Sequence, residues 1–235
     1  MYTGTVKTIG LIGGMSWEST TTYYRKINEG VKARLGGLHS ADILLRSIDF
    51  EPMEELQRRE DWDAAASFLT DIAQGLERAG ADFLLICTNT MHKVAPQVQE
   101  RIGIPLLHIA DAAGARLEKS HIRTVGLLGT KFTMEQDFYR RRIEDGYGIE
   151  VTVPGKKDQE EIHRIIYDEL CTGRFDPESR NFYLGVIQDL SSRGAEGVIL
   201  GCTEIPLLVG QPDTRVRLFD TAEIHASTAV EMALS

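Results

Sequence analysis

The hydrophobic positions of the chain fall into short runs rich in β-branched residues, separated by stretches with apolar residues at helical spacing. This alternation is typical of parallel strands joined by crossover helices. It predicts strands near residues 7–13, 42–48, 82–88, 105–109, 123–129, 149–153, 197–202 and 216–219. It predicts helices over about 17–34, 61–79, 91–101, 111–119, 133–145, 158–171, 177–193 and 221–234. The fold class is therefore α/β, with each parallel sheet flanked by helices.

Two of the predicted helices carry a signature at their start. Thr133 is followed three residues later by Gln136, and Asp220 by Glu223. A small polar residue three positions before an acid or amide is the spacing of a capping box. We therefore expect helices to begin at Thr133 and just after Asp220.

The second half of the chain repeats the first. Residues 8–13 (TIGLIG) are echoed by 124–129 (TVGLLG), and 80–86 (GADFLLI) by 194–200 (GAEGVIL), at offsets of 116 (124 − 8) and 114 (194 − 80). A weaker echo links 23–25 (YYR) with 138–140 (FYR). We expect two pseudo-symmetric domains, residues 1–115 and 116–220, with the last helix, about 221–235, packing on the first half.

The repeat pairs a threonine with a cysteine. Continuing the second echo without a gap sets Thr88 opposite Cys202, while Cys87 falls opposite Gly201. The symmetry mates are thus Thr88 and Cys202, and not the two cysteines.

Composition narrows the function classes. The 235 residues are 42% hydrophobic and 26% charged, which is ordinary for a soluble protein, and no apolar run approaches the roughly 18 residues of a membrane helix. The N-terminal residues show no secretory signal pattern, so we expect a cytoplasmic protein. A formal net charge of −9 argues against binding to nucleic acid or to an anionic membrane. The three cysteines are too widely spaced for a zinc site and suggest free thiols.

Candidate chemistry gathers just after the apolar runs. In open α/β sheets, ligands bind beyond the carboxyl ends of the strands, which here are residues 13–16, 87–90, 129–130 and 201–204. The Gly-Gly-Met-Ser turn at 13–16 could hold a carboxylate or phosphate, or serve the turn alone. It matches neither the dinucleotide fingerprint nor the P-loop pattern. The polar pairs at 89–90 and 203–204 suit a small zwitterion, although turn and cap chemistry explains either pair equally well.

Cys202 is the candidate base. At the end of a strand and the start of a helix or turn, a thiol pKa of about 8.5 can be lowered towards neutrality, which predicts a thiolate ready to take a proton. Free cysteines are more often buried apolar residues, and we assign that role to Cys87 and Cys171. The place of Cys202 in the repeat favours the catalytic interpretation.

The segments 8–15, 87–92 (CTNTMH) and 201–204 (GCTE), in this order and spacing, resemble the aspartate/glutamate racemase family over almost the whole chain. Within that family the branch of broad-specificity amino-acid racemases is the most similar. The resemblance implies an active site in the cleft between two α/β domains. It also implies racemisation of a small amino acid without pyridoxal phosphate, metal or any other cofactor, often by a homodimer. Two cysteines facing opposite sides of Cα usually serve as the bases.

The chain departs from this pattern at the first cysteine, because Thr88 stands where the family has Cys-Asn-Thr. A threonine hydroxyl is a far weaker acid than a thiol, so it is no comparable base at neutral pH. By analogy, Cys202 should remove the Cα proton of an L-amino acid and Thr88 should support reprotonation on the other face, directly or through water.

The resemblance also suggests substrate contacts. Asn89 and Thr90 would hold the α-carboxylate, Glu204 would fix the geometry around Cys202, and the remaining contacts would come from Met15, Ser16, Thr130, Thr133 and Thr203. The family's lysine for the distal group aligns with Glu160, which leaves room for neutral polar substrates. Other candidates for a distal carboxylate are Arg46, Arg58, Lys156, Lys157 and Arg164. We interpret His92 and His108 as structural histidines.

Two alternatives stay open. A decarboxylase or hydantoin racemase of the same fold could use one thiol to protonate a carbanion. A non-catalytic protein that binds or senses amino acids would explain the loss of the first cysteine.

Overall fold

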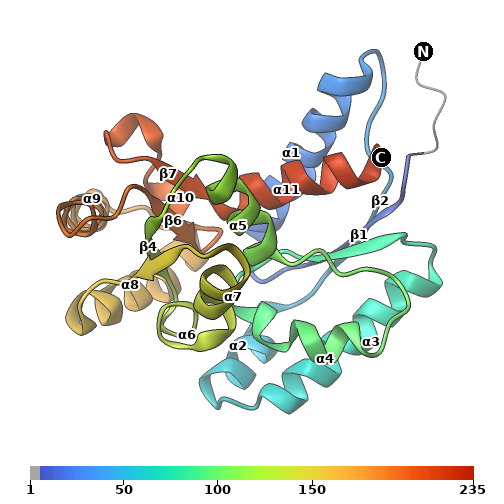
Figure 1. The fold of residues 1–235 in the computed structure, drawn as a ribbon. Coiled ribbons are helices and arrows are strands. Elements are labelled where there is room, and N and C mark those ends of the chain that lie inside the picture. Colours follow the sequence, from blue (N-terminus) through green and yellow to red (C-terminus); the bar gives the residue numbers. More distant parts are fainter. Residues whose placement is uncertain (1–5) are drawn as a thin grey trace. The chain divides into compact units, whose positions relative to one another are not determined.

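A computed structural model describes residues 6–235, which divide into two compact units. The first unit holds the described residues up to Ile109 together with His225–Ser235, and the second holds Ala110–Ile224. Figure 1 colours the chain from β1 near the N-terminus to α11 (Thr221–Ala233) at the C-terminus. The last helix therefore begins in the second unit and ends in the first.

The first unit is built on a parallel sheet of three strands in the order β2-β1-β3. These are β1 (Ile9–Gly13), β2 (Ile43–Ser47) and β3 (Phe83–Ile86). The strand expected at 105–109 is reduced to one parallel bridge, between Leu84 and Leu106. β1 is buried along its whole length, as a central parallel strand covered on both faces should be.

Helices flank this sheet: α1 (Trp17–Leu35), α2 (Phe50–Arg58), α3 (Trp62–Arg78), the 3₁₀ turn η1 (Thr90–Val94) and α4 (Ala95–Gln99). Leu84 and Ile86 alternate along β3 and join a core cluster with Leu69 and Ala73 of α3. Cys87 is fully buried, which confirms its expected place in the core. Burial also raises the pKa of its thiol far above the ordinary value.

The second unit repeats this plan with one strand more, in the order β5-β4-β6-β7, all parallel. Its strands are β4 (Thr124–Gly129), β5 (Glu150–Thr152), β6 (Val198–Gly201) and β7 (Leu218–Asp220). Its helical segments are α5 (Ile109–Lys119), α6 (Lys131–Glu135), α7 (Asp137–Tyr147), α8 (Lys156–Asp168), η2 (Leu170–Thr172), α9 (Pro177–Ser192), α10 (Ile205–Leu208) and η3 (Gln211–Asp213). Two parallel-sheet units flanked by helices confirm the predicted fold class.

The helix starts were predicted with mixed success. Asp220 accepts a hydrogen bond from the backbone N–H of Glu223 at 3.1 Å, as its spacing predicts. Thr133 is not the cap. The residue that caps α6 is Thr130, which has an extended backbone and whose Oγ1 accepts a hydrogen bond from the N–H of Thr133 at 3.4 Å. The expected helix over 133–145 is instead two helices that meet at Gln136, whose backbone is extended. No helix within residues 6–235 combines the length and apolar character needed to cross a membrane.

Candidate active site

Thr88 and Cys202 occupy equivalent places in the two sheets. In the first sheet Ile12 of β1 pairs with Ile86 of β3, and Thr88 follows two residues later. In the second sheet the register of β4 and β6 pairs residues 128 and 200, and Cys202 again follows two residues later. Because strand residues alternate between faces, a spacing of two from matched positions gives the two side chains corresponding places at the carboxyl ends of β3 and β6.

Cys202 is buried beside an acidic residue. Its side chain is buried in the core cluster of the second unit, and its Sγ donates a hydrogen bond to Oε2 of Glu204 at 2.8 Å. The hydroxyl of Thr203 donates to the same oxygen at 3.1 Å. Burial, and then the negative charge of Glu204, raise the pKa of Cys202 well above its ordinary value. The thiolate expected at neutral pH is therefore wrong for the chain without substrate.

Thr88 is half-buried on the bend between β3 and η1. Its neighbours Asn89 and Thr90 are buried, and η1 begins at Thr90. The carbonyl oxygen of Thr88 lies 2.7 Å from Nδ1 of His92. Three polar residues thus follow β3 in a turn that a buried histidine holds.

The turn after β1 is locked by its own hydrogen bonds. Gly14 has φ +93°, and a Cβ there would lie 2.2 Å from the carbonyl oxygen of Ile48, so only glycine fits. Its N–H donates to Oγ1 of Thr20 at 2.8 Å, and that hydroxyl donates to the carbonyl of Ser16 at 2.7 Å. Met15 and Ser16, which a cis peptide bond joins, are both buried. The Gly14 N–H thus serves the turn, which favours the structural interpretation for this donor.

Thr130 and Thr133 lie together at the end of β4. Both are buried, and their hydroxyl oxygens are 3.3 Å apart. The structure therefore brings these two predicted residues into one polar pair within the second unit. Cys202, Thr203 and Glu204 form a second polar group after β6.

Most of the basic residues expected to contact a distal carboxylate are either paired with acidic side chains or exposed. Arg58 lies 3.8 Å from Glu54, and Arg164 is held by Glu161 and by the buried Glu169. The side chains at 156, 157 and 160 are exposed. With Asp168 at 3.9 Å, Arg164 already has three carboxylate partners in its own unit.

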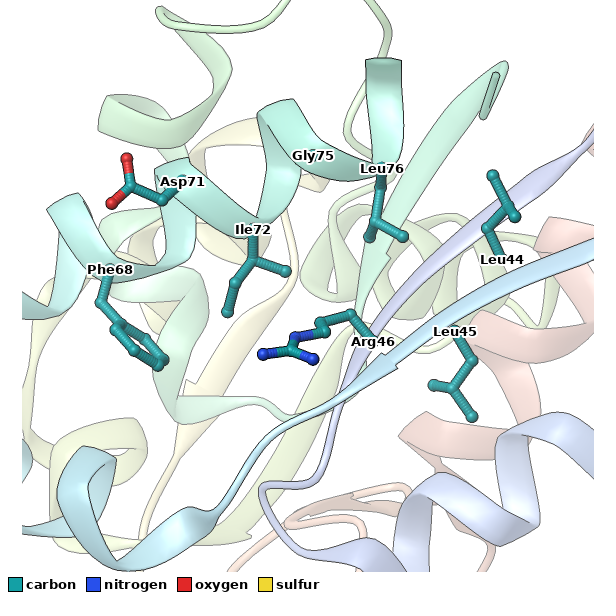
Figure 2. Close-up of a pocket in the computed structure, with 8 residues that line it drawn as sticks. All are labelled: Leu44, Leu45, Arg46, Phe68, Asp71, Ile72, Gly75 and Leu76. Carbon is teal, nitrogen blue, oxygen red and sulfur yellow. The ribbon is translucent and has the colours of Figure 1, made fainter. Parts of the chain in front are cut away.

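Arg46 lines a separate cavity of about 520 Å³ between β2 and α3. Figure 2 shows its guanidinium extending toward Ile72 and Phe68, with Asp71 beyond them. The wall is largely apolar, and none of its lining residues comes from the turns after β1 or β3. Arg46 thus belongs to the outer edge of the first sheet.

No pattern in the sequence pointed to Gln57. This residue lies on α2, a helix that the pattern did not predict, and its amide is buried. Its Nε2 donates to Sδ of Met91 at 3.0 Å, which places it beside the turn after β3. Because Met91 directly follows Thr90 in η1, Gln57 is a further candidate for a substrate contact.

Within the described residues no three His, Cys, Asp or Glu side chains gather as a set of metal ligands. The two parallel sheets with polar residues at their strand ends define an α/β protein of internally repeated architecture. The chain matches the family described as Asp/Glu/Hydantoin racemase over residues 12–229 and belongs to that family. It is accordingly an isomerase of the amino-acid racemase class.

Similar proteins agree with this assignment. A crystal structure of a proposed Asp/Glu racemase from Yersinia pestis is 53% identical, with a TM-score of 0.90 over 97% of this chain and 100% of that one. An aspartate racemase homologue from Pyrococcus horikoshii OT3 is 39% identical, with a TM-score of 0.83 over the same shares. The broad specificity amino-acid racemase RacX of Bacillus subtilis is 23% identical over 97% of this chain and 98% of its own length.

Proposed function

We propose that this protein racemises a small amino acid at Cα without a cofactor, with Cys202 as the principal base and Thr88 in the other base position. The equivalence of Thr88 and Cys202 in the two strand registers carries the proposal, because racemisation needs proton-transfer groups for two opposite faces. The substrate would be aspartate, glutamate or a broader set. The relatives described as aspartate racemase homologue and broad specificity amino-acid racemase support that range.

The reaction would begin by activating a thiol, since Cys202 rests in its protonated form. Glu204 already accepts the thiol hydrogen bond, so its carboxylate can take that proton when the substrate ammonium group enters and favours the thiolate. The thiolate would then remove the Cα proton of the L-amino acid. The carbanion would take a proton on its other face from water or the hydroxyl at Thr88. The hydroxide or alkoxide left there would be neutralised through solvent by the proton that Glu204 took, which restores the resting state. No electron pair leaves the substrate, so the product is the D-amino acid.

The other strand-end residues would bind the substrate. Asn89 and Thr90 would hold the α-carboxylate, and Thr203 and Thr130 would hold the amine or the opposite carboxylate oxygen. Met15, Ser16 and Thr133 would complete the walls. All of these side chains are buried, which supports a site where their hydrogen bonds are stronger than in water.

The unequal bases impose a kinetic limit. Mirror-image amino acids have equal free energies, so kcat/KM must be the same in both directions whatever residue occupies position 88. A weak group at Thr88 slows turnover both ways, and its asymmetry appears only in kcat and KM taken separately. A well-placed acid or base contributes about 10²- to 10⁴-fold, so its loss lowers activity without abolishing it.

Incubation in deuterated water tests the function. L- and D-aspartate, L- and D-glutamate and neutral polar amino acids are supplied separately, and NMR and chiral chromatography follow Cα–H loss and inversion. We expect inversion by the unmodified protein, loss of inversion in Cys202→Ser, and unchanged activity in the thiol control Cys171→Ser. Binding without exchange would instead support the sensing alternative, and loss of carbon dioxide from a malonate-type acid would support the decarboxylase.

A further inference from the structure

His92 is a buried histidine whose two ring nitrogens are both occupied by the backbone. It lies in η1 and is 1% exposed. Its Nδ1 is 2.7 Å from the carbonyl oxygen of Thr88, and the backbone N–H of Ile109 donates to its Nε2 at 3.2 Å. The ring thus joins the turn after β3 to the first residue of α5.

These two contacts fix the tautomer. The N–H of Ile109 can only donate, so Nε2 must carry a lone pair. The ring proton then lies on Nδ1 and is donated to the carbonyl of Thr88, which can only accept. One neutral form of His92 satisfies both partners, and the doubly protonated form would set two N–H groups against each other at Ile109.

Neighbouring rings restrict the orientation of His92. The imidazoles of His108 and His225 lie 4.5 and 5.7 Å from it, centroid to centroid. His225 is itself held, because its Nε2 lies 2.9 Å from the carbonyl of Leu107 and its Nδ1 lies 2.9 Å from the hydroxyl of Tyr23. The histidine therefore rests on a framework of the first unit that is independent of Thr88.

The bond to Thr88 orients a whole peptide group. A trans peptide is planar, and its C=O and N–H point in opposite directions. Holding the carbonyl of Thr88 on the ring side directs the N–H of Asn89 to the other side. The same bond limits rotation of the backbone that carries the side chain of Thr88.

We propose that His92 is a positioning residue for proton transfer at Thr88: its Nδ1–H holds the 88–89 peptide so that the hydroxyl of Thr88 and the N–H of Asn89 are correctly aimed at the substrate. This proposal rests on the proposed racemase function. It assigns to His92 an influence on one face of Cα only, because Cys202 and its hydrogen-bond partner Glu204 follow β6 in the other unit. His92 itself touches no reacting atom.

Two amide variants separate the bonds of His92. In His92→Asn, the amide reaches about as far as Nδ1 and can still donate to the carbonyl of Thr88. In His92→Gln, the longer amide reaches towards the place of Nε2 and can accept from Ile109, but the bond to Thr88 is lost. Each variant loses one of the two buried hydrogen bonds of the ring. If His92 only stabilised the fold, both variants would therefore lose similar amounts of stability and activity.

The diagnostic measurement starts from L-aspartate and L-glutamate in deuterated water. For each molecule that loses its Cα–H, we measure the fraction that returns as the D-form. This fraction reports how the intermediate is reprotonated and does not depend on how much of the enzyme is folded. We expect it to fall about tenfold in His92→Gln and to stay near the unmodified value in His92→Asn, since small misalignments at a reacting group cost about that much or more.

The proposal would be overturned if the fraction returning as the D-form were the same in His92→Gln as in the unmodified protein. It would also be overturned if this fraction fell equally in His92→Gln and His92→Asn. Tyr23→Phe is the matched control, because it loosens the same framework without touching Thr88 and should leave the fraction unchanged.

If the unmodified protein exchanges no amino acid, the proposed function fails and the positioning role is tested by NMR. The amide signal of Asn89 should then shift in His92→Gln and stay in place in His92→Asn. An amide signal that is unmoved in both variants would refute the positioning role by itself.

Discussion

The thiol of Cys202, which is 7% exposed, donates a hydrogen bond to the carboxylate of the buried Glu204 at 2.8 Å. Both the burial and the adjacent negative charge favour the protonated thiol. The same carboxylate is the nearest group able to take the thiol proton. Glu204 therefore opposes the thiolate in the resting protein and would assist its formation when a cationic substrate arrives.

Glu204→Gln should lower the pKa of Cys202, because it removes the negative charge beside the sulfur. The measurement is the pH dependence of alkylation by iodoacetamide in a Cys171→Ser background, where Cys87 is fully buried. Glu204→Asp keeps the charge and should keep the raised pKa. An alkylation profile that is identical in the Gln variant and its parent would contradict this account of the thiol.

Thr88→Cys should raise kcat/KM about tenfold or more, since a thiol is a much better acid and base than a hydroxyl. The increase must be equal in both directions, because the two enantiomers have the same free energy. Thr88→Val, which keeps the shape and removes the hydroxyl, should lower both values. A rise in one direction alone would show that the assay does not measure racemisation.

Two buried tyrosines in the two units should respond oppositely to the loss of their hydroxyl. Tyr139 has no hydrogen-bond partner for its hydroxyl in the described structure, so Tyr139→Phe should raise the free energy of unfolding by up to about 1 kcal/mol. Tyr23→Phe breaks the bond to Nδ1 of His225 and should lower it by about 1–3 kcal/mol. Urea unfolding at pH 7 gives both values. Equal signs for the two changes would refute the assignment of these hydroxyls.

Acid should weaken the fold through His225. Burial, and then the nearby His92, lower the pKa of His225 to about 3, whereas in the unfolded chain it is about 6.5. Between these values the unfolded state binds the proton and the folded state does not, so stability falls as the pH drops from about 6.5 towards 3. The slope is about 1.4 kcal/mol per pH unit for one proton.

The check for His225 is a series of urea midpoints from pH 7 to pH 4. His225→Gln should be less stable at pH 7 and should lose less stability on acidification than the parent. His163 contributes in the same direction in both proteins, because burial and Lys131 lower its pKa to about 4. An unchanged pH slope in the variant would show that His225 already binds a proton in the folded state.

The pattern of apolar runs along the chain was enough to predict most strands of the two sheets. Seven of the expected strands formed. Three of them, β1, β3 and β6, are buried along their whole length, as a parallel strand covered on both faces should be. The repeat also predicted the pairing of Thr88 with Cys202, and the observed registers agree with it. α2 escaped prediction, since it is short and carries Pro52 within its first turn.

The repeat was less reliable between the strands. The echo of 23–25 in 138–140 sets Tyr24 against Tyr139, yet the fully buried pair is Tyr23 and Tyr139, at the offset of 116 (139 − 23) that the first strands share. Tyr24 is 52% exposed. Burial on a helix depends on which face meets the sheet, and an alignment of three letters does not contain that information.

The sequence by itself determined the architecture, the family and the residues that end each strand, because these follow from apolar periodicity and from order along the chain. The tertiary structure decided their chemical state. It buried Cys202 against Glu204 and so kept the thiol protonated, and it placed His92 between Thr88 and Ile109, residues 21 positions apart (109 − 88). Desolvation and hydrogen bonds arise where distant segments meet, so acidity and orientation at the site depend on the completed fold.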